Sequence, residues 1–260
     1  MAAQLQNPFD MAGQVVLVTG GAKGVGRGIA ARFAAAGATV VVCGRNAPEG
    51  TGDRDPQFVA CDVRDPEQVD AMVADIAGRF GRLDVVVNNA GGSPPADAAT
   101  ASPRFSRAIV ELNLLAPLFV AQAANRVMQA QPSGGVILNI GSVSGVRPSP
   151  GTAAYGAAKA ALANLTQSLA IEWAPKVRVN CVIAGLVRTE QSHLHYGDDP
   201  GIAAVAATVP AGRLAEPTEI GDACLFLASA SAGYISGANL VVHGGGERPA
   251  FLDAANPPPG

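Results

Sequence analysis

The sequence predicts a single α/β domain built on a Rossmann-type, doubly wound parallel sheet. A valine-rich strand, Val15 to Val18, runs into a glycine-rich turn and then a helix pattern. Strand and helix patterns go on alternating without an internal repeat or a linker, as they do in α/β domains. The strands are continuous apolar runs, which is typical of parallel strands covered by helices on both faces. At 260 residues and 48% hydrophobic, the chain is long enough to bury one core.

The apolar runs and their spacing place the individual elements. Strands are expected around Leu17, Val41, Val59, Val86, Leu138, Val179 and Val241, and helices over 24–36, 66–79, 103–130, 155–174 and 217–229. The domain should span residues 12–246, between an N-terminal extension, 1–11, and a C-terminal tail, 247–260. The prolines at 257–259 exclude a regular helix or strand there. Residues 186–214, with a weak helix at 201–208, break the alternation, and connections this long are often functional.

The first turn has the glycine spacing of a pyrophosphate-binding site. Glycines at 20, 24 and 26 permit a tight strand-to-helix turn, let the backbone approach a pyrophosphate and direct the helix N-terminus at it. A glycine-rich turn alone is weak evidence. Here a second strand, Thr39 to Cys43, follows at the spacing of a βαβ unit. The sequence therefore predicts a bound dinucleotide.

Tyr155 and Lys159 lie four residues apart in a helix pattern, which places phenol and ammonium on one helix face. A phenol with a pKa of about 10 is a poor base at neutral pH, and lowering it by about three units takes roughly 4 kcal/mol. A neighbouring cation can supply part of that stabilisation. Since an ordinary surface helix can also carry this pair, the interpretation depends on the rest of the chain.

The Thr-Gly-x-x-x-Gly-x-Gly turn with Tyr-x-x-x-Lys downstream resembles the short-chain dehydrogenase/reductase family, over roughly residues 12 to 246. The resemblance implies four catalytic residues: Asn113, Ser142, Tyr155 and Lys159. It also implies a cofactor site made of Gly20, Lys23, Gly24, Val25, Gly26, Arg45, Asp62, Val63, Asn89, Ala90, Gly91, Tyr155, Lys159, Gly185, Val187 and Thr189. In this family Asp62 and Val63 would contact adenine, the Asn88–Gly91 motif would stabilise the sheet, and the 186–214 segment would form a lid over substrate.

Two positions depart from the family pattern. Ala184-Gly185 stands where the family usually has Pro-Gly, and His243-Gly244-Gly245-Gly246 where it tends to have Asp-Gly-Gly. Neither position performs the chemistry. The departures affect the expected geometry of the nicotinamide loop and of subunit packing.

The charges after the second strand predict NADP(H) as the cofactor, with NAD(H) less favoured. An NAD-selective site usually places Asp or Glu there to hold the ribose hydroxyl, whereas this chain has Gly44-Arg45. Lys23 adds a second cation in the glycine turn. Guanidinium and ammonium groups suit a 2′-phosphate, although both side chains also fit a solvated loop.

The expected reaction interconverts a secondary alcohol and a ketone, with Tyr155 transferring the proton and Ser142 bonding the same oxygen. The expected pocket wall is mostly apolar, which favours a hydrophobic substrate. It comprises Gly92, Ser93, Pro94, Val143, Ser144, Val146, Pro148, Leu186 and the lid. The overall resemblance is strongest to 3-oxoacyl-thioester reductases and next to hydroxysteroid or cyclic-alcohol dehydrogenases. A dinucleotide-sensing or scaffold protein would not need the intact Ser, Tyr and Lys, and a nucleotide-sugar epimerase needs a longer chain.

Composition and residue patterns also bear on nucleic-acid binding, membrane insertion and metal binding. A net charge of −3 argues against non-specific nucleic-acid binding. No apolar run approaches a membrane span of about 20 residues, and the first residues lack an export signal, so a cytoplasmic protein is expected. The four cysteines read as buried thiols, and His193 and His195 lack partners at ligand spacing, so no metal is expected. By resemblance, helices 103–130 and 155–174 would form a dimer interface, within a homotetramer.

Overall fold

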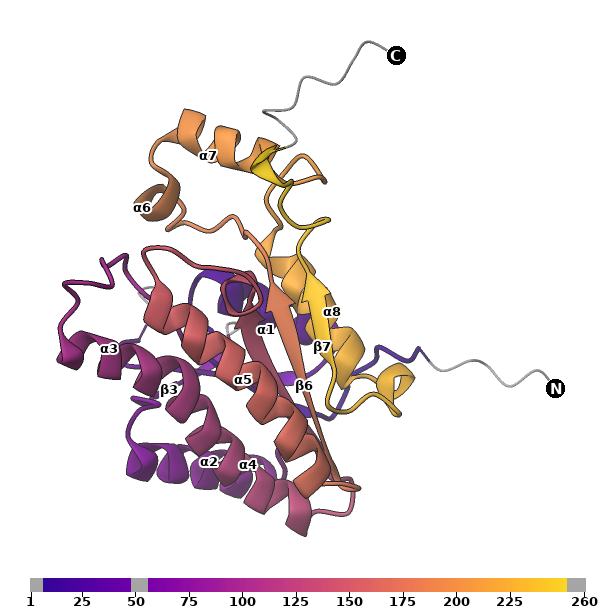
Figure 1. The fold of residues 1–260 in the computed structure, drawn as a ribbon. Helices are drawn as coiled ribbons and strands as arrows, with labels where there is room; N and C mark the ends of the chain where they lie inside the picture. The colour runs from indigo at the N-terminus through magenta and orange to yellow at the C-terminus, as the bar shows by residue number, and fades with distance from the viewer. Residues whose placement is uncertain (1–6, 48–55, 252–260) are drawn as a thin grey trace.

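The computed structural model describes residues 7–47 and 56–251, and within them it shows a seven-stranded, fully parallel sheet between two helical layers (Figure 1). The strand order is β3-β2-β1-β4-β5-β6-β7, so the doubly wound fold is confirmed. The strands are β1 Val15–Thr19, β2 Thr39–Gly44, β3 Gln57–Ala60, β4 Val85–Asn88, β5 Gly135–Ser142, β6 Val177–Ala184 and β7 Asn239–Val242. Each contains one of the predicted strand centres.

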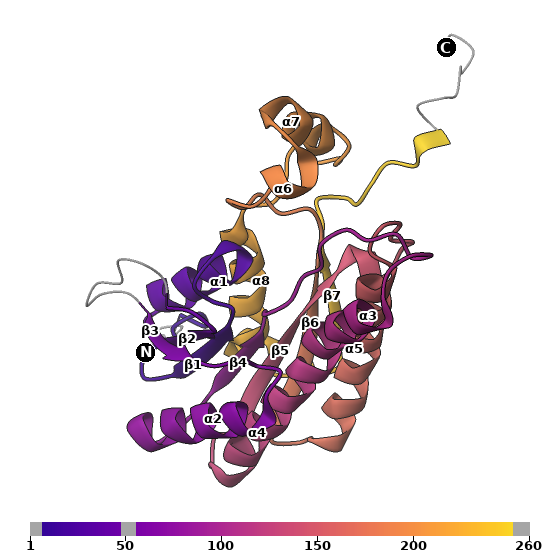
Figure 2. The same ribbon diagram turned by 90° about the vertical axis from the view of Figure 1, so that its left-hand side faces the viewer.

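The helices are divided between the two faces of the sheet, as Figure 2 shows. One face is covered by α2 Pro66–Phe80, α4 Ala116–Ala130 and α5 Ala153–Glu172, and the other by α1 Gly24–Ala35 and α8 Pro217–Ala228. Local chemistry sets the ends of these helices. The Asp65 carboxylate accepts from the Glu67 N–H at 3.0 Å to begin α2, and Gly81, with φ 72°, ends it.

The helix expected over residues 103–130 is divided by a π-helical turn. It comprises α3 Pro103–Val110, the π segment η1 Glu111–Leu115 and α4. The Asn113 side chain donates to the Ile109 carbonyl and to the Gly92 carbonyl, each at 2.9 Å. The first bond lies within the helix and the second ties it to a loop, and π turns of this kind often mark functional sites.

The helix Pro103–Ala130 is also long and apolar enough, by length and composition, to cross a membrane. The expectation that no apolar run approaches that length was therefore wrong. Its apolar side chains have a different use, because Val120, Ala124 and Met128 are buried in the core against the sheet. Core helices of this kind pass the same test.

The segment 186–214 rises above the carboxyl ends of the strands (Figure 1). It contains α6 His193–Tyr196 and α7 Asp199–Ala207, where a weak helix was expected over 201–208. The Asp198 carboxylate accepts from the Gly201 N–H at 3.1 Å and caps α7. We call residues 186–214 the lid segment.

The described ends of the chain adjust the predicted boundaries. Met11, expected in the N-terminal extension, is 1% exposed and packs in the core, and its N–H donates to the Ala36 carbonyl at 2.8 Å. The ordered domain therefore begins before residue 12. The expectation for the proline-rich end, residues 256–260, lies outside the described residues.

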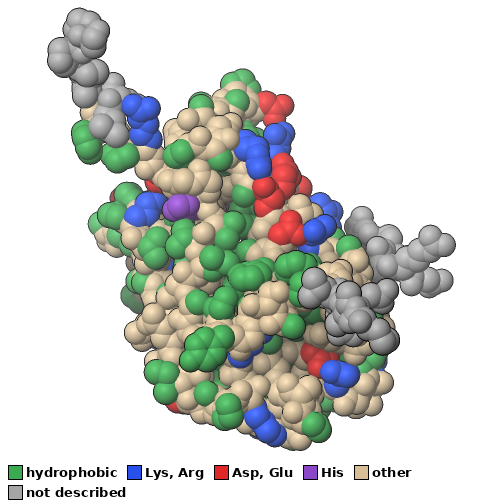
Figure 3. All heavy atoms as spheres, turned by 90° about the vertical axis from the view of Figure 1, so that its right-hand side faces the viewer, with side chains coloured by type: hydrophobic (Ala, Val, Ile, Leu, Met, Phe, Trp, Pro, Cys, Tyr) green, Lys and Arg blue, Asp and Glu red, His purple; other side chains and the backbone are tan. Residues whose placement is uncertain are grey.

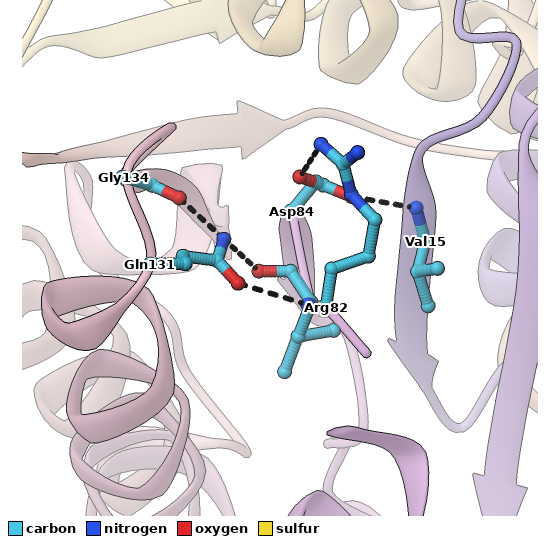
Figure 4. Close-up of polar contacts among 6 residues, drawn as sticks. Val15, Arg82, Asp84, Gln131 and Gly134 are labelled. Atoms are coloured by element: carbon cyan, nitrogen blue, oxygen red, sulfur yellow. Dashed lines mark hydrogen bonds and ion pairs between the residues drawn. The ribbon is translucent and has the colours of Figure 1, made fainter. Parts of the chain in front are cut away.

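Opposite the lid, Asp84 joins the amino ends of two neighbouring strands (Figure 4). Its side chain is 8% exposed and accepts from the Val15 N–H at 2.8 Å. Two further bonds, each 2.7 Å long, come from the Arg82 guanidinium. Asp84 thus supplies an acceptor to a buried β1 donor that begins the sheet ladder.

Replacing Asp84 by alanine should lower the free energy of unfolding by about 1–3 kcal/mol, because the Val15 N–H loses its buried acceptor. Urea denaturation at fixed protein concentration measures this change. Asp75→Ala is the matched control, since it breaks an exposed pair with Arg79 and should have little effect. Equal effects of the two substitutions would contradict a special role for Asp84.

Candidate active site

The glycine turn between β1 and α1 is shaped as the sequence predicts. Gly20 and Gly24 have φ values of 64° and 53°, a left-handed conformation that favours glycine. A Cβ on Gly26 would lie 2.4 Å from the Asn89 side-chain nitrogen and 2.4 Å from the Gly20 carbonyl oxygen. Asn89 in turn donates from that nitrogen to the Thr19 carbonyl at 2.9 Å. The turn is therefore fastened to the end of β4.

A carboxylate from the lid segment already lies at the N-terminus of α1. The Gly24 N–H donates to Glu190 Oε1 at 2.9 Å, and Arg27 lies 3.8 Å from the other carboxylate oxygen. These partners help to hold the pKa of Glu190 below its usual value, although partial burial opposes them. The helix end thus accommodates an anion, as the helix dipole and free N–H groups favour. Sequence analysis missed Glu190.

Ser142, Tyr155 and Lys159 come together at the carboxyl end of β5. Ser142 is the last residue of β5, and Tyr155 and Lys159 occupy successive turns of α5. Ser142 lies close enough to the Tyr155 phenol to lower its pKa. Lys159 is 4% exposed, and its Nζ donates to the Ile140 carbonyl at 2.8 Å and lies 5.7 Å from the Tyr155 ring centroid. The Tyr-x-x-x-Lys spacing therefore directs both groups to one side of α5.

The electrostatics differ from the expectation that Lys159 lowers the Tyr155 pKa. Burial raises the pKa of Tyr155 above its ordinary value, and Ser142 only partly opposes that effect. The Lys159 ammonium, 5.7 Å from the Tyr155 ring centroid, does not offset the effect of burial. Burial lowers the pKa of Lys159 to about 8, so its charge is present at neutral pH and is lost as pH rises through that value.

Asn113 is fully buried beside this cluster and holds the loop after β4. Its Oδ1 accepts from the Gly92 N–H at 2.8 Å. A Cβ on Gly91 would lie 2.6 Å from Asn113 Oδ1 and 3.3 Å from Lys159 Nζ. Only glycine fits between these two side chains, so the structure brings Asn113 and Lys159 together as predicted.

Two adjoining cavities collect the predicted cofactor residues. The larger, about 510 Å³, is lined by Gly20, Lys23, Gly24, Val25, Gly26, Arg45, Asn89, Ala90, Gly91, Gly185, Val187 and Thr189, together with Ser142, Tyr155 and Lys159. The smaller, about 160 Å³, is lined by Asp62 and Val63, with Gly20, Arg45 and Ala90 shared between the two. The sequence-predicted residues therefore form one continuous cleft along the carboxyl edge of the sheet.

Asp62 has a partner that sequence analysis missed. Arg64 donates from Nε to Asp62 Oδ1 at 2.9 Å and from a terminal nitrogen to Oδ2 at 2.5 Å. These bonds are the main reason that the pKa of Asp62 is lowered, and the Arg45 charge adds to them. A paired Asp62 carboxylate leaves this end of the cleft less negative than the sequence implies.

A buried chain of polar side chains supports the cluster from within the sheet. Asn88 donates to Asn139 Oδ1 at 2.9 Å, Asn139 donates to Thr166 Oγ1 at 2.9 Å, and Thr166 donates to the Leu162 carbonyl at 2.8 Å. The chain runs from β4 through β5 to α5, which carries Tyr155. Thr166 was missed, because a threonine in a helix pattern gives no signal of a buried partner.

The two departures from the family pattern, at Ala184 and His243, lie close together, because Gly185 next to Ala184 packs against His243. A Cβ on Gly185 would lie 2.7 Å from both Cα and Cβ of His243. The retained glycine is therefore required for the close approach of the β6 and β7 ends. His243 contributes to the wall of a further cavity beside the cluster.

That further cavity, about 610 Å³, shares Gly185 with the cleft and carries charge that sequence analysis did not place there. Apolar side chains line it, including Val143, Leu186 and Val209, but so do Arg147, Glu247 and Arg248. Arg147 and Glu247 form an ion pair across 100 residues of chain. The expected pocket wall included Val146 and Pro148 but not the charged groups of Arg147, Glu247 and Arg248.

The cysteines and histidines show no sign of a metal site among the described residues. Cys43, Cys61, Cys181 and Cys224 are buried, free thiols, as expected. Across residues 7–47 and 56–251, no group of three His, Cys, Asp or Glu side chains could hold a metal ion. The two lid histidines lie in α6, and His195 lines the cleft.

Comparison with known proteins agrees with this geometry. Residues 20–247 match the family model described as Enoyl-(Acyl carrier protein) reductase. The chain belongs to the short-chain dehydrogenase/reductase family. It is 39% identical to an L-fucose dehydrogenase of Oryctolagus cuniculus, covering 91% of this chain and 86% of that protein. It is 36% identical to the 3-oxoacyl-[acyl-carrier-protein] reductase of Escherichia coli, covering 91% and 98%.

A solved structure of the family matches over almost the whole chain. The aldohexose dehydrogenase of Thermoplasma acidophilum, in ligand-free form, superposes with a TM-score of 0.85 at 31% identity, covering 96% of this chain and 98% of that one. Members of the family are oxidoreductases that use nicotinamide dinucleotides and act on alcohols or ketones. This coarse activity therefore applies to the chain.

Proposed function

We propose that the protein is an NADP(H)-dependent oxidoreductase that interconverts a secondary alcohol and a ketone. One observation carries the proposal: the side chains of Ser142, Tyr155 and Lys159 line the same cleft as the glycine turn. Proton-transfer groups and a pyrophosphate-shaped turn thus share one cavity. Such convergence of polar groups in a cleft marks a reaction site.

The residues present fit a dinucleotide. The helix N-terminus already donates from the Gly24 N–H to the Glu190 carboxylate, where a phosphate oxygen would be the acceptor. The pyrophosphate would lie against Val25 and Gly26. The adenine would lie against Asp62 and Val63. The nicotinamide would lie against Gly185, Val187 and Thr189. When bound, the cofactor supplies or accepts a hydride at the substrate carbon.

The protein's own residues would manage the proton. Tyr155 would donate it to a ketone oxygen, or take it from an alcohol, while Ser142 bonds the same oxygen. Lys159 would hold the nicotinamide ribose and stabilise phenolate as it forms. Asn113, next to Lys159, would connect that ammonium to solvent through a water.

Arg45 and Lys23 support a preference for the phosphorylated cofactor. Both line the cleft at the glycine-turn end, and both are exposed in the described structure. Because Arg64 pairs with Asp62, the nearest carboxylate opposes a 2′-phosphate less than a free one would. Guanidinium and ammonium groups then remain to bind that phosphate.

Several substrates are compatible with this reaction. The similar proteins include one named for L-fucose, one for aldohexoses and one for 3-oxoacyl-carrier-protein thioesters. The predicted 3-oxoacyl-like substrate stays a prediction: the last of these names and the apolar part of the wall favour it, whereas the charged part of the wall opposes it. Hydroxysteroids and cyclic alcohols remain the alternatives.

The test is turnover by the purified protein, followed by NADPH absorbance. The panel contains 3-oxoacyl thioesters, steroid and cyclic ketones with NADPH, and the matching alcohols and sugars with NADP⁺. Cofactor-dependent turnover of at least one substrate is expected. Tight cofactor binding with no turnover anywhere would favour the dinucleotide-sensing alternative.

Glu190 should compete with the cofactor for the N-terminus of α1. Replacing Glu190 by glutamine should strengthen NADPH binding about two- to fivefold, because removing one charge at a helix N-terminus changes binding by about 0.3–1 kcal/mol. Fluorescence titration of NADPH measures the dissociation constant. Glu67→Gln, at the start of α2, is the control, and weaker binding by the Glu190 variant would mean that the carboxylate supports the cofactor instead.

We also propose a cytoplasmic homo-oligomer, in keeping with the oligomers common in this family. Exposed apolar side chains occur at Leu115 and Ile171, on the two helices expected at a dimer interface, and at Tyr234 and Val241. Figure 3 shows the face on the β7 side, where hydrophobic side chains spread among uncharged ones. Light scattering at micromolar concentration should give a dimer or tetramer mass.

A further inference from the structure

The Arg147–Glu247 ion pair lies in the wall of the cavity beside the Tyr155–Ser142 pair. Arg147 is five residues beyond Ser142, on the loop before α5, and Glu247 follows β7 near the described end of the chain. Both line the 610 Å³ cavity, which adjoins the cleft at Gly185. A volume of this size accommodates a small organic ligand.

Electrostatics connect the ion pair with the reacting group. The lid residue Tyr196 is partly buried, and its pKa is raised by burial and by the Glu247 charge and lowered by the Arg147 charge. Tyr196 in turn contributes to the raised pKa of Tyr155. Tyr196 therefore lies within electrostatic range of both the ion pair and Tyr155.

The pair offers both kinds of hydrogen-bonding group. Arg147 donates to the Pro148 carbonyl at 2.9 Å and to Glu247, yet its Nε is buried and finds no partner among the described residues. Glu247 is an acceptor only. Apolar side chains from Val143, Val146 and Leu186 line the same cavity. The wall thus combines donors, acceptors and apolar surface.

We propose that this cavity binds a neutral, polyhydroxylated substrate, such as a sugar or cyclic polyol, and that Arg147 and Glu247 select it by bonding its hydroxyl groups. The inference rests on the proposed function and specifies its substrate class. A hydroxyl both donates and accepts, so neighbouring hydroxyls can bond guanidinium and carboxylate together, while C–H faces pack on the apolar wall.

The two competing classes fit this wall less well. An acyl chain would remove water from the ion pair without replacing its hydrogen bonds, which is costly. An anionic hydroxy acid would gain from Arg147 and Arg248, but to bond Arg147 it would have to displace the Glu247 carboxylate or lie against it. A neutral polyol meets neither cost.

The experiment compares substrates that differ in hydroxyl number. With NADP⁺, kcat/KM should rise from cyclohexanol through cyclohexane-1,2-diol to pyranose sugars, and the best sugar should exceed 3-hydroxyacyl thioesters and hydroxy acids. Arg147→Met and Glu247→Gln should each lower kcat/KM for the sugar by about 10- to 100-fold, as expected for lost bonds to charged groups. The loss should appear mainly in KM, with cyclohexanol changed less than about twofold.

Matched controls are Arg126→Met and Asp70→Asn, which break an exposed ion pair between α4 and α2. These should leave every substrate unchanged. Turnover confined to thioesters or hydroxy acids, or equal losses on sugar and cyclohexanol in the Arg147 and Glu247 variants, would overturn the substrate assignment alone. Absence of turnover with all substrates would instead overturn the proposed reaction, and this inference with it.

Discussion

Replacing Tyr155 by phenylalanine is expected to lower kcat by about 10²–10⁴-fold, the usual contribution of a general acid or base. The change deletes one oxygen and keeps the ring that packs near Lys159, so the cofactor dissociation constant should stay nearly the same. The Ser142 hydroxyl would lose its partner but remain in the cleft. Steady-state kinetics with the best substrate and a separate NADPH titration measure the two quantities.

Two further variants test the assignment of Tyr155 as the general acid or base. Lys159→Ala should damage both turnover and cofactor binding, because the buried ammonium lies in the cleft beside Tyr155. Tyr196→Phe removes a second phenol that lies in the electrostatic field around Tyr155, and it should reduce kcat far less. If Tyr155→Phe kept more than about a tenth of the wild-type rate, Tyr155 would not be the general acid or base.

The fold was predictable because its signals are local. The strands are mostly apolar, and the helices between them follow from periodicity, so all seven strand centres lie in strands. The glycine turn could also be predicted from the sequence. A Cβ on Gly26 would clash with the Asn89 side chain and the Gly20 carbonyl, and a turn packed this closely requires glycine wherever it occurs. The π turn at Asn113 could not be predicted, because it is accompanied by two hydrogen bonds between the Asn113 side chain and the Gly92 backbone, 21 residues earlier in the chain.

The contacts that sequence analysis missed join residues far apart in the chain. Glu190 reaches Gly24 across 166 residues, and Glu247 reaches Arg147 across 100. Nothing in the local sequence around a surface glutamate indicates its partner. The expected substrate wall was mostly apolar, because it included Val146 and Pro148 but not Arg147 between them, and because Glu247 reaches the cavity from beyond β7.

The direction of the Tyr155 pKa shift could not be predicted from the sequence, for a different reason. Spacing alone correctly placed the phenol and the ammonium on one helix face. The Tyr155 pKa is raised because burial outweighs the opposing contribution of Ser142. The degree of burial depends on three-dimensional positions, which spacing cannot supply.

The wild-type protein is expected to prefer NADP(H) over NAD(H) by at least about tenfold in kcat/KM. Arg45 and Lys23 can each add a charge-assisted bond to the 2′-phosphate, at about 1.5–3 kcal/mol per bond. Changing Gly44 to Asp together with Arg45→Ala should shift the preference toward NAD(H), mainly through KM. The new carboxylate would accept from the ribose hydroxyls, and the phosphate would lose its guanidinium partner.

The structure makes this double substitution a fair test. A Cβ on Gly44 would meet only Phe58 Cε2, at an ordinary 3.7 Å, so the aspartate should not disturb β2. Arg64→Met is the companion variant, because it frees the Asp62 carboxylate and should weaken NADP(H) more than NAD(H) through repulsion of the phosphate. Steady-state kinetics with both cofactors on all three proteins decide the matter. Equal efficiency of the two cofactors with wild type would mean that the Arg45 side chain points to solvent and takes no part in the choice.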